Sequence, residues 1–187
     1  MSAPIADAVG LALGPDGLIT EYLTAAAELA PDVALPPEVA TVTPSLAFLL
    51  GDPLRGPGVT SAGALAGVRS VHGALTVQDD GGRVRGFLTG PVGVATDRPG
   101  GLDLTLEGVL VVVDGAVVDS ATGAAVLGHP ARALAAAANA LGPQGVTLER
   151  GWLVLTGGLT APVPVRPGAV IACEYTHLGA LGVRAGA

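Results

Sequence analysis

Glycine and proline interrupt every apolar stretch of this 187-residue chain, which contains 29 Gly and 15 Pro. Both residues favour tight turns, so we expect many short elements rather than a few long ones. Half of the residues are hydrophobic, yet no apolar run approaches the roughly 18 residues that a membrane-spanning helix needs. The length suits one domain with a sizeable core built from Val, Leu and Ala.

The charged residues exclude several classes of function. The net charge is −7 and the nine basic residues are all arginines, scattered singly, so no basic surface is expected to follow a nucleic-acid backbone. The absence of lysine excludes Schiff-base chemistry and a lysine general base. Cys173, the one cysteine, lies in an apolar stretch and predicts a buried, unreactive thiol. The N-terminus lacks the pattern of a signal peptide, and we expect a cytoplasmic protein.

The expected elements are mostly strands. Asp114-Gly115 between two apolar runs predicts a two-residue hairpin, and Asp80-Gly81-Gly82 predicts a second turn. A principal helix is expected from Pro130, a residue suited to a first helical turn, to Gly142. We also expect a helix over residues 20–30, which are rich in Ala and end before a proline, and a short helix over residues 61–75, capped by Thr60 and including His72.

Two strands carry polar residues on one face. Thr43 and Ser45 are two residues apart in the otherwise apolar stretch VTPSLAFLLG (residues 42–51), so they share a face. In LDLTLEG, Asp103, Thr105 and Glu107 alternate with leucines, and we expect them to form a solvated face. These patterns predict one mainly β (α+β) domain with one principal helix.

Several segments in order resemble the 2-keto-4-pentenoate hydratase/4-oxalocrotonate decarboxylase branch of the fumarylacetoacetate hydrolase superfamily. They are LAFLLGDPLRGPGVT (residues 46–60), GAAVLGHP from Gly123, the helix with Asn139, the turn LTGGLT (residues 155–160), and the closing Leu178-Gly179. The resemblance covers about residues 42 to 185. It implies a mixed β-roll, shortened at its N-terminus, with residues 1–41 as the remnant of a longer region and residues 42–187 as the domain.

The resemblance also implies a divalent cation held by three acidic side chains, which chelates a 2-oxo acid substrate. It places those ligands at Thr43, Ser45 and Thr76, where this chain has hydroxyls. Hydroxyls are weak, neutral ligands for a hard cation, so we expect no metal cofactor. Asp79 and Asp80 are interpreted as a solvated turn, with rescue of a metal site as the alternative.

Other catalytic groups of the branch are also replaced. Its lysine has no counterpart, and residues 9–14 (VGLALG) are the expected remnant of the segment that carries it. Gly158 stands where hydratases have a serine. The old pocket is expected to be lined by Thr43, Ser45, Thr76, Gly157, Gly158 and Thr160.

Two functions remain open at this point. One is a catalytically degenerate binding or partner subunit that self-associates or pairs with a full-length relative, with no role for nucleic acid or membrane. The other is a metal-independent lyase, isomerase or cyclase acting on a small enolisable ligand in the old pocket. His177 is interpreted either as a surface-loop residue or, with Glu174, as a new acid–base pair for that second function.

Overall fold

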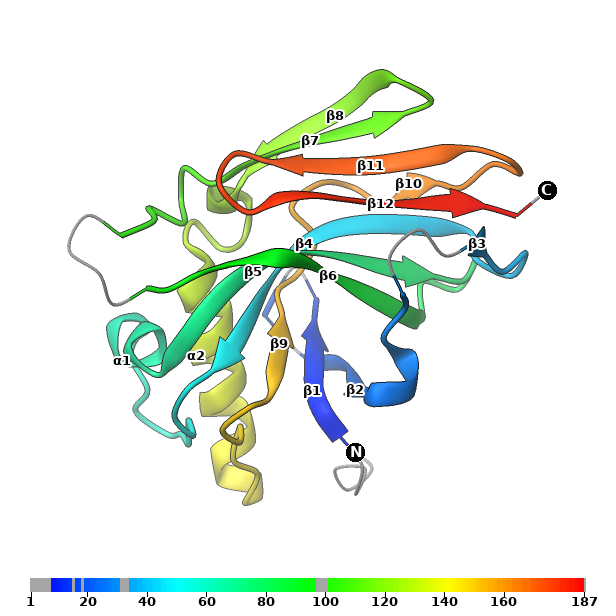
Figure 1. The fold of residues 1–187 in the computed structure, drawn as a ribbon. Helices are drawn as coiled ribbons and strands as arrows, with labels where there is room; N and C mark the ends of the chain where they lie inside the picture. Colours follow the sequence, from blue (N-terminus) through cyan, green and yellow to red (C-terminus); the bar gives the residue numbers. More distant parts are fainter. Residues whose placement is uncertain (1–7, 15, 18, 31–33, 97–100, 187) are drawn as a thin grey trace.

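Two β-sheets lie one above the other and enclose most of the apolar core (Figure 1). The structure is a computed structural model that describes residues 8–14, 16–17, 19–30, 34–96 and 101–186. Among these residues no helix is long and apolar enough to cross a bilayer. The mostly stranded, curled architecture with one main helix confirms the predicted fold class.

The larger sheet has seven strands in the order β2-β1-β9-β4-β5-β6, with β10 paired to β4. β1 runs parallel to β9, and the other pairs are antiparallel. The bounds are β1 Ala8–Leu13, β2 Ile19–Thr24, β4 Thr41–Leu50, β5 Val68–Gln78, β6 Val84–Val94, β9 Leu153–Leu155 and β10 Val163–Pro164.

The smaller sheet has five strands in the order β3-β12-β11-β7-β8. Asp114 and Gly115 join β7 to β8 with φ angles of 50° and 83°, which confirms the predicted two-residue hairpin. The bounds are β3 Ala34–Leu35, β7 Gly108–Val113, β8 Ala116–Thr122, β11 Val170–Tyr175 and β12 Gly179–Ala185.

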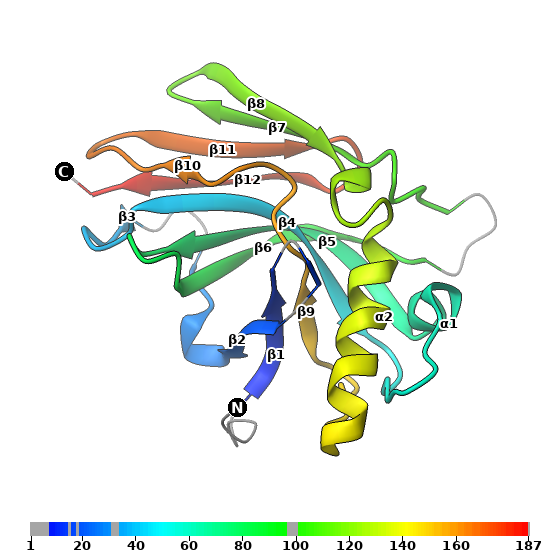
Figure 2. The same cartoon turned by 180° about the vertical axis from the view of Figure 1, so that it is seen from behind.

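The principal helix, α2 (Pro130–Leu141), begins and ends where the sequence predicts. His129 caps it, because its Nδ1 accepts a hydrogen bond from the amide of Ala131 at 3.0 Å. The helix packs beside α1 (Ser61–Ala66), which Thr60 caps as expected (Figure 2). Three short 3₁₀ helices complete the set: η1 Ala25–Ala27, η2 Gly123–Ala125 and η3 Gly142–Gln144.

Three local predictions are wrong. The helix expected over residues 20–30 is β2 followed by η1, because pairing with β1 outweighs the helix propensity of the alanines. The helix capped by Thr60 ends at Ala66, and β5 begins at Val68. Residues 103–107 form a turn rather than a strand.

Tyr175 connects the two sheets through the core. Its hydroxyl lies 2.8 Å from the carbonyl oxygen of Ser45 and 2.7 Å from that of Ala74, so the single hydrogen is shared between β4 and β5. Gly73 makes room for the ring, since a Cβ there would lie 2.6 Å from Tyr175 Cδ2. This contact holds the polar face of β4 at a fixed distance from the smaller sheet.

Candidate functional site

Strand β4 is buried on both faces, and its two faces differ in chemistry. Val42, Leu46 and Phe48 join the main core between the sheets, whereas Ala47 belongs to a second, smaller apolar cluster. Thr43 and Ser45 share the face of Ala47 by strand alternation. Thr43 pairs directly with Thr76 on β5, as an antiparallel ladder requires for two side chains that meet on one face.

A cavity of about 290 Å³ opens at the Thr43–Thr76 pair. It includes four of the six residues predicted to line the old pocket: Thr43, Thr76, Gly158 and Thr160. Ser45 and Gly157 are buried but are not part of its wall. The other wall residues are Ala12, Leu13, Gly14, Gln78, Gly82, Val84, Thr156 and Pro162.

Gly158 allows the turn over residues 157–160 to approach β4. A Cβ at Gly158 would lie 2.4 Å from Thr43 Cγ2 and 2.9 Å from the carbonyl oxygen of Thr160. Any larger residue would push the turn away from Thr43. The glycine therefore shapes this wall, at the position where the resemblance implies a serine.

The hydroxyls of the wall donate their hydrogens to the protein. Thr43 donates to Gln78 Oε1 at 3.0 Å, and Thr76 donates to the carbonyl oxygen of Thr43 at 3.2 Å. Thr156 donates to the carbonyl oxygen of Gly157 at 3.0 Å, and Thr160 to that of Ala161 at 2.9 Å. The wall is thus polar and, through these bonds, internally organised.

Ser45 is the exception among the buried hydroxyls. Its side chain is 1% exposed, and its Oγ has no hydrogen-bond partner within the part of the chain that the structure describes. A buried hydroxyl without a partner costs free energy, about 1–3 kcal/mol in comparable cases. Ser45 therefore marks an unsatisfied polar group on the same face as the cavity.

The donor set does not fit a divalent cation. None of the twelve wall residues is ionisable, and three neutral hydroxyls stand at the implied ligand positions. Asp79 accepts hydrogen bonds from the amides of Gly81 and Arg83 and pairs with Arg85 Nε at 3.0 Å, so it is engaged in the β5–β6 turn. Within the described ranges, no three His, Cys, Asp or Glu residues lie close enough to share an ion.

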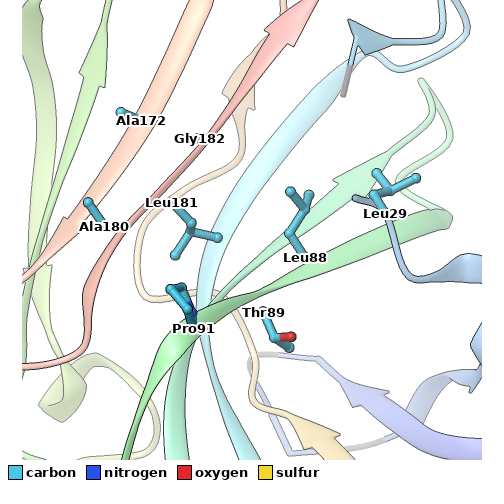
Figure 3. A pocket seen from close by; sticks show the side chains of 8 residues that line it. All are labelled: Leu29, Leu88, Thr89, Pro91, Ala172, Ala180, Leu181 and Gly182. Carbon is cyan, nitrogen blue, oxygen red and sulfur yellow. The ribbon is translucent and has the colours of Figure 1, made fainter. Parts of the chain in front are cut away.

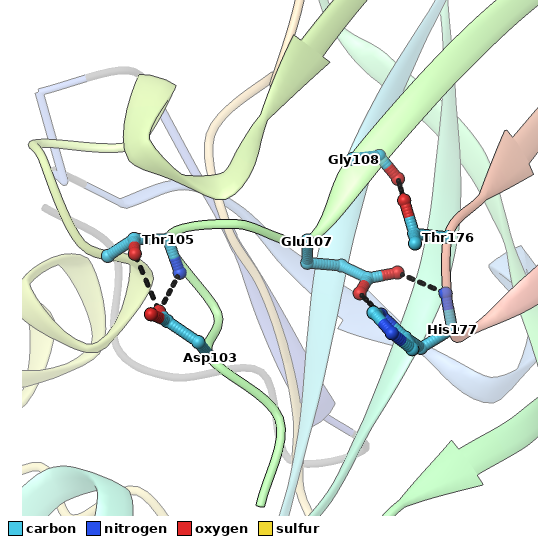
Figure 4. Close-up of polar contacts among 6 residues, drawn as sticks. All are labelled: Asp103, Thr105, Glu107, Gly108, Thr176 and His177. Carbon is cyan, nitrogen blue, oxygen red and sulfur yellow. Dashed lines mark hydrogen bonds and ion pairs between the residues drawn. The ribbon is translucent and has the colours of Figure 1, made fainter.

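His177 pairs with Glu107, not with Glu174 (Figure 4). Glu107 is completely buried; its Oε2 lies 2.8 Å from His177 Nδ1, and its Oε1 accepts the His177 amide at 2.9 Å. The prediction of a solvated Glu107 is therefore wrong, because the turn over residues 103–107 directs this side chain inward. His177 remains 58% exposed and, with Glu174, lies outside the wall of the Thr43 cavity.

Asp103, His72 and Cys173 lie away from the Thr43 cavity. Hydrogen bonds from the hydroxyl and amide of Thr105 lower the pKa of the exposed Asp103. His72 lies on β5 rather than on a helix and bonds to Ser70 Oγ and to the carbonyl oxygen of Gly90. Cys173 is buried as predicted, and burial raises the pKa of its thiol to about 12.

A second, apolar hollow of about 390 Å³ lies where β6 meets β12 (Figure 3). Leu88 and Pro91 line it from β6, Leu181 from β12, and Leu29 from the segment after η1. Its one side-chain hydroxyl, that of Thr89, donates to Glu28 at 3.2 Å. This surface can bury apolar groups, but it offers no reactive side chain.

Three wall or partner residues were not predicted from the sequence. Gln78 lies two residues after Thr76, so strand alternation could have placed it on the same face. Thr156 lies within the predicted turn over residues 155–160 but was not assigned to the pocket, and the bond from the amide of Leu46 to its Oγ1 spans 110 residues. Glu107 carries no local signal of burial.

The chain has relatives of known activity, although no protein-family model matches it. It is 37% identical over 155 residues to a 4-oxalocrotonate decarboxylase of Pseudomonas sp., covering 75% of this chain and 58% of the relative. It is 31% identical over 162 residues to a 2-oxo-hept-4-ene-1,7-dioate hydratase of Escherichia coli, covering 74% and 59%. The chain thus spans somewhat over half the length of these relatives.

A similar solved structure is the 4-oxalocrotonate decarboxylase of Pseudomonas putida G7 complexed with magnesium and adipate. The TM-score is 0.85 at 26% identity, and the match covers 95% of this chain and 78% of that chain. The two folds therefore correspond over nearly the whole chain.

Proposed function

This chain belongs to the fumarylacetoacetate hydrolase superfamily, and its relatives include hydratases and decarboxylases. We propose that it has lost the divalent-metal chemistry of these relatives and acts as a binding or partner subunit. The observation that supports this most is the wall of the Thr43 cavity. Hydroxyls stand where the resemblance implies carboxylates, and none of the twelve described wall residues has an ionisable side chain that compensates for them.

The alternative function needs an acid or base beside the ligand. A metal-independent lyase, isomerase or cyclase would have to move a proton at the cavity. The threonines of the wall are committed to internal acceptors, and the His177–Glu107 pair belongs to the β11–β12 turn. The arrangement therefore favours binding over catalysis.

The apolar hollow at β6 and β12 supports the partner role. Leu29 and Leu181 are partly exposed aliphatic residues around an open hollow whose floor includes the buried Leu88, and such surfaces commonly bury a protein partner. A second copy of this chain or a full-length relative is the proposed partner. Light scattering after size-exclusion chromatography, with and without Leu181→Asp, tests this: a monomer in both samples, and no complex with the relative, would contradict it.

The loss of metal chemistry is tested with the purified protein and Mn²⁺. We expect no stoichiometric Mn²⁺ by elemental analysis, and no decarboxylation of 4-oxalocrotonate or hydration of 2-hydroxypenta-2,4-dienoate with Mg²⁺ or Mn²⁺ supplied. The Pseudomonas decarboxylase measured under the same conditions is the positive control. Turnover that a chelator abolishes would show that this chain retains a metal site.

A further inference from the structure

The side-chain hydroxyls that line the Thr43 cavity present hydrogen-bond acceptors rather than donors. The acceptors of Thr76, Thr156 and Thr160 are backbone carbonyls, which carry no hydrogen, so each hydroxyl must be the donor. Each hydroxyl oxygen uses its one hydrogen in this way and keeps lone pairs. What remains for a ligand at these positions is acceptor capacity.

The same conclusion holds for Thr43 through the orientation of Gln78. The Gln78 Nε2 group lies 3.4 Å from the carbonyl oxygen of Gly82, which can only accept. In this orientation Oε1 faces the hydroxyls of Thr43 and Thr41, at 3.0 and 3.3 Å, and Nε2 keeps a second hydrogen as a donor. A flipped amide would place Gln78 Oε1 next to the carbonyl oxygen of Gly82. In the unflipped orientation the Thr43 hydroxyl donates to Gln78 Oε1 and keeps its lone pairs for a ligand.

We infer that this cavity takes a neutral small molecule that carries N–H or O–H donors, and that it rejects 2-oxo carboxylates. Among the described wall residues, an anion would meet lone pairs with no cation to offset its desolvation, whereas an ammonium group would find no carboxylate. The inference rests on the proposed function in one respect, because it takes the site as working without a metal ion.

Primary carboxamides carry two N–H donors that can meet the acceptor oxygens of the wall, and they have no net charge, so they are suitable probes. Ser45 lies behind the wall on the same face of β4 and takes no part in the test.

The test compares acids with their amides of the same shape. Ligand-observed NMR in EDTA-containing buffer at pH 7 measures the dissociation constants of two pairs of compounds. The pairs are adipamide with adipate and pyruvamide with pyruvate. We expect the amide of each pair to bind at least about tenfold more tightly than the acid, a difference of about 1.4 kcal/mol. Thr43→Val and Thr76→Val keep the side-chain shape but remove the acceptor oxygen, and each should weaken amide binding several-fold.

Two further variants keep the test decisive. Ser120→Ala, at an exposed position on β8 outside this cavity, should bind the amides as the unmodified protein does. If a thermal melt shows that Thr43→Val or Thr76→Val does not fold, Thr160→Val replaces it as a wall variant. Acids that bind as tightly as amides, binding of neither, or amide binding unaffected by all the wall variants would overturn the inference.

These outcomes are distinguishable from failure of the proposed function. Metal-dependent turnover of 4-oxalocrotonate would refute the function. A preference for acids in EDTA, together with no turnover, would refute only the neutral-ligand inference.

Discussion

Twelve residues without an ionisable side chain line the cavity at Thr43, whereas the turn at His177 buries the carboxylate of Glu107 completely. Both regions are polar and both lie beside the core. In the cavity, neutral hydroxyls donate to the amide oxygen of Gln78 and to backbone carbonyls. At the turn, a buried carboxyl group is tolerated because the amide of His177 donates to one of its oxygens and the ring Nδ1 of the same residue lies 2.8 Å from the other. The described interior thus holds a carboxyl group where one residue supplies two polar partners for it.

The largest expected effect comes from placing charge in the cavity. Thr43→Glu, Ser45→Glu and Thr76→Glu together should lower the free energy of unfolding by several kcal/mol, on the order of the cost of burying unpaired carboxylates. Millimolar Mn²⁺ should restore part of the melting temperature, because an ion that binds only the folded state stabilises it. Thermal melts with and without Mn²⁺ measure both effects.

The neutral triple variant with Gln at the same three positions is the control for side-chain size. It should not respond to Mn²⁺. A Glu variant whose melting temperature is indifferent to Mn²⁺ would mean that these residues do not surround one ion site, and the proposed correspondence with the metal ligands would fail.

Removing charge from the turn should have a smaller effect. Glu107→Ala deletes the acceptor for both the amide and the ring of His177 and should lower the free energy of unfolding by about 1–3 kcal/mol. Denaturant titration measures this change. Glu174→Ala removes an exposed carboxylate three residues before His177 and should leave stability unchanged. Equal stability of the two variants would contradict a structural role for the pair.

The smallest expected effect is a loss of stability at alkaline pH. Burial raises the pKa of Cys173 to about 12 and raises that of Tyr175 above its ordinary value. The unfolded chain therefore loses these protons at a lower pH than the folded protein. Their contribution is fully present below the ordinary pKa values and is lost as pH rises toward the folded ones. Denaturant titrations at pH 8 and 10 should show lower stability at pH 10.

Iodoacetamide labelling followed by mass spectrometry provides the independent check. Cys173 should remain unmodified in the folded protein at pH 8 and react after guanidinium is added, because thiolate is the reactive form. Rapid labelling of the folded protein would show that this part of β11 is open to solvent.

Local chemistry was sufficient to predict several parts of this fold from the sequence. The hairpin at Asp114-Gly115, the helix that begins at Pro130 and the cap at Thr60 each depend on a few neighbouring residues. Strand alternation likewise placed Thr43 and Ser45 on one face, because side chains in a strand alternate with a period of two.

Pairing and burial across the chain were decided only by the tertiary structure. Residues 20–24 form a strand because β1 lies beside them, despite the run of alanines that follows. Glu107 is buried because His177, 70 residues later, supplies its partners, and Thr156 meets Leu46 across 110 residues. Such contacts leave no periodic or local pattern in the sequence, since each depends on where a distant segment packs. Thr43, Thr76, Gly158 and Thr160 were therefore predicted as cavity residues, whereas Gln78, Thr156 and the direction of the hydrogen bonds were decided by the tertiary structure.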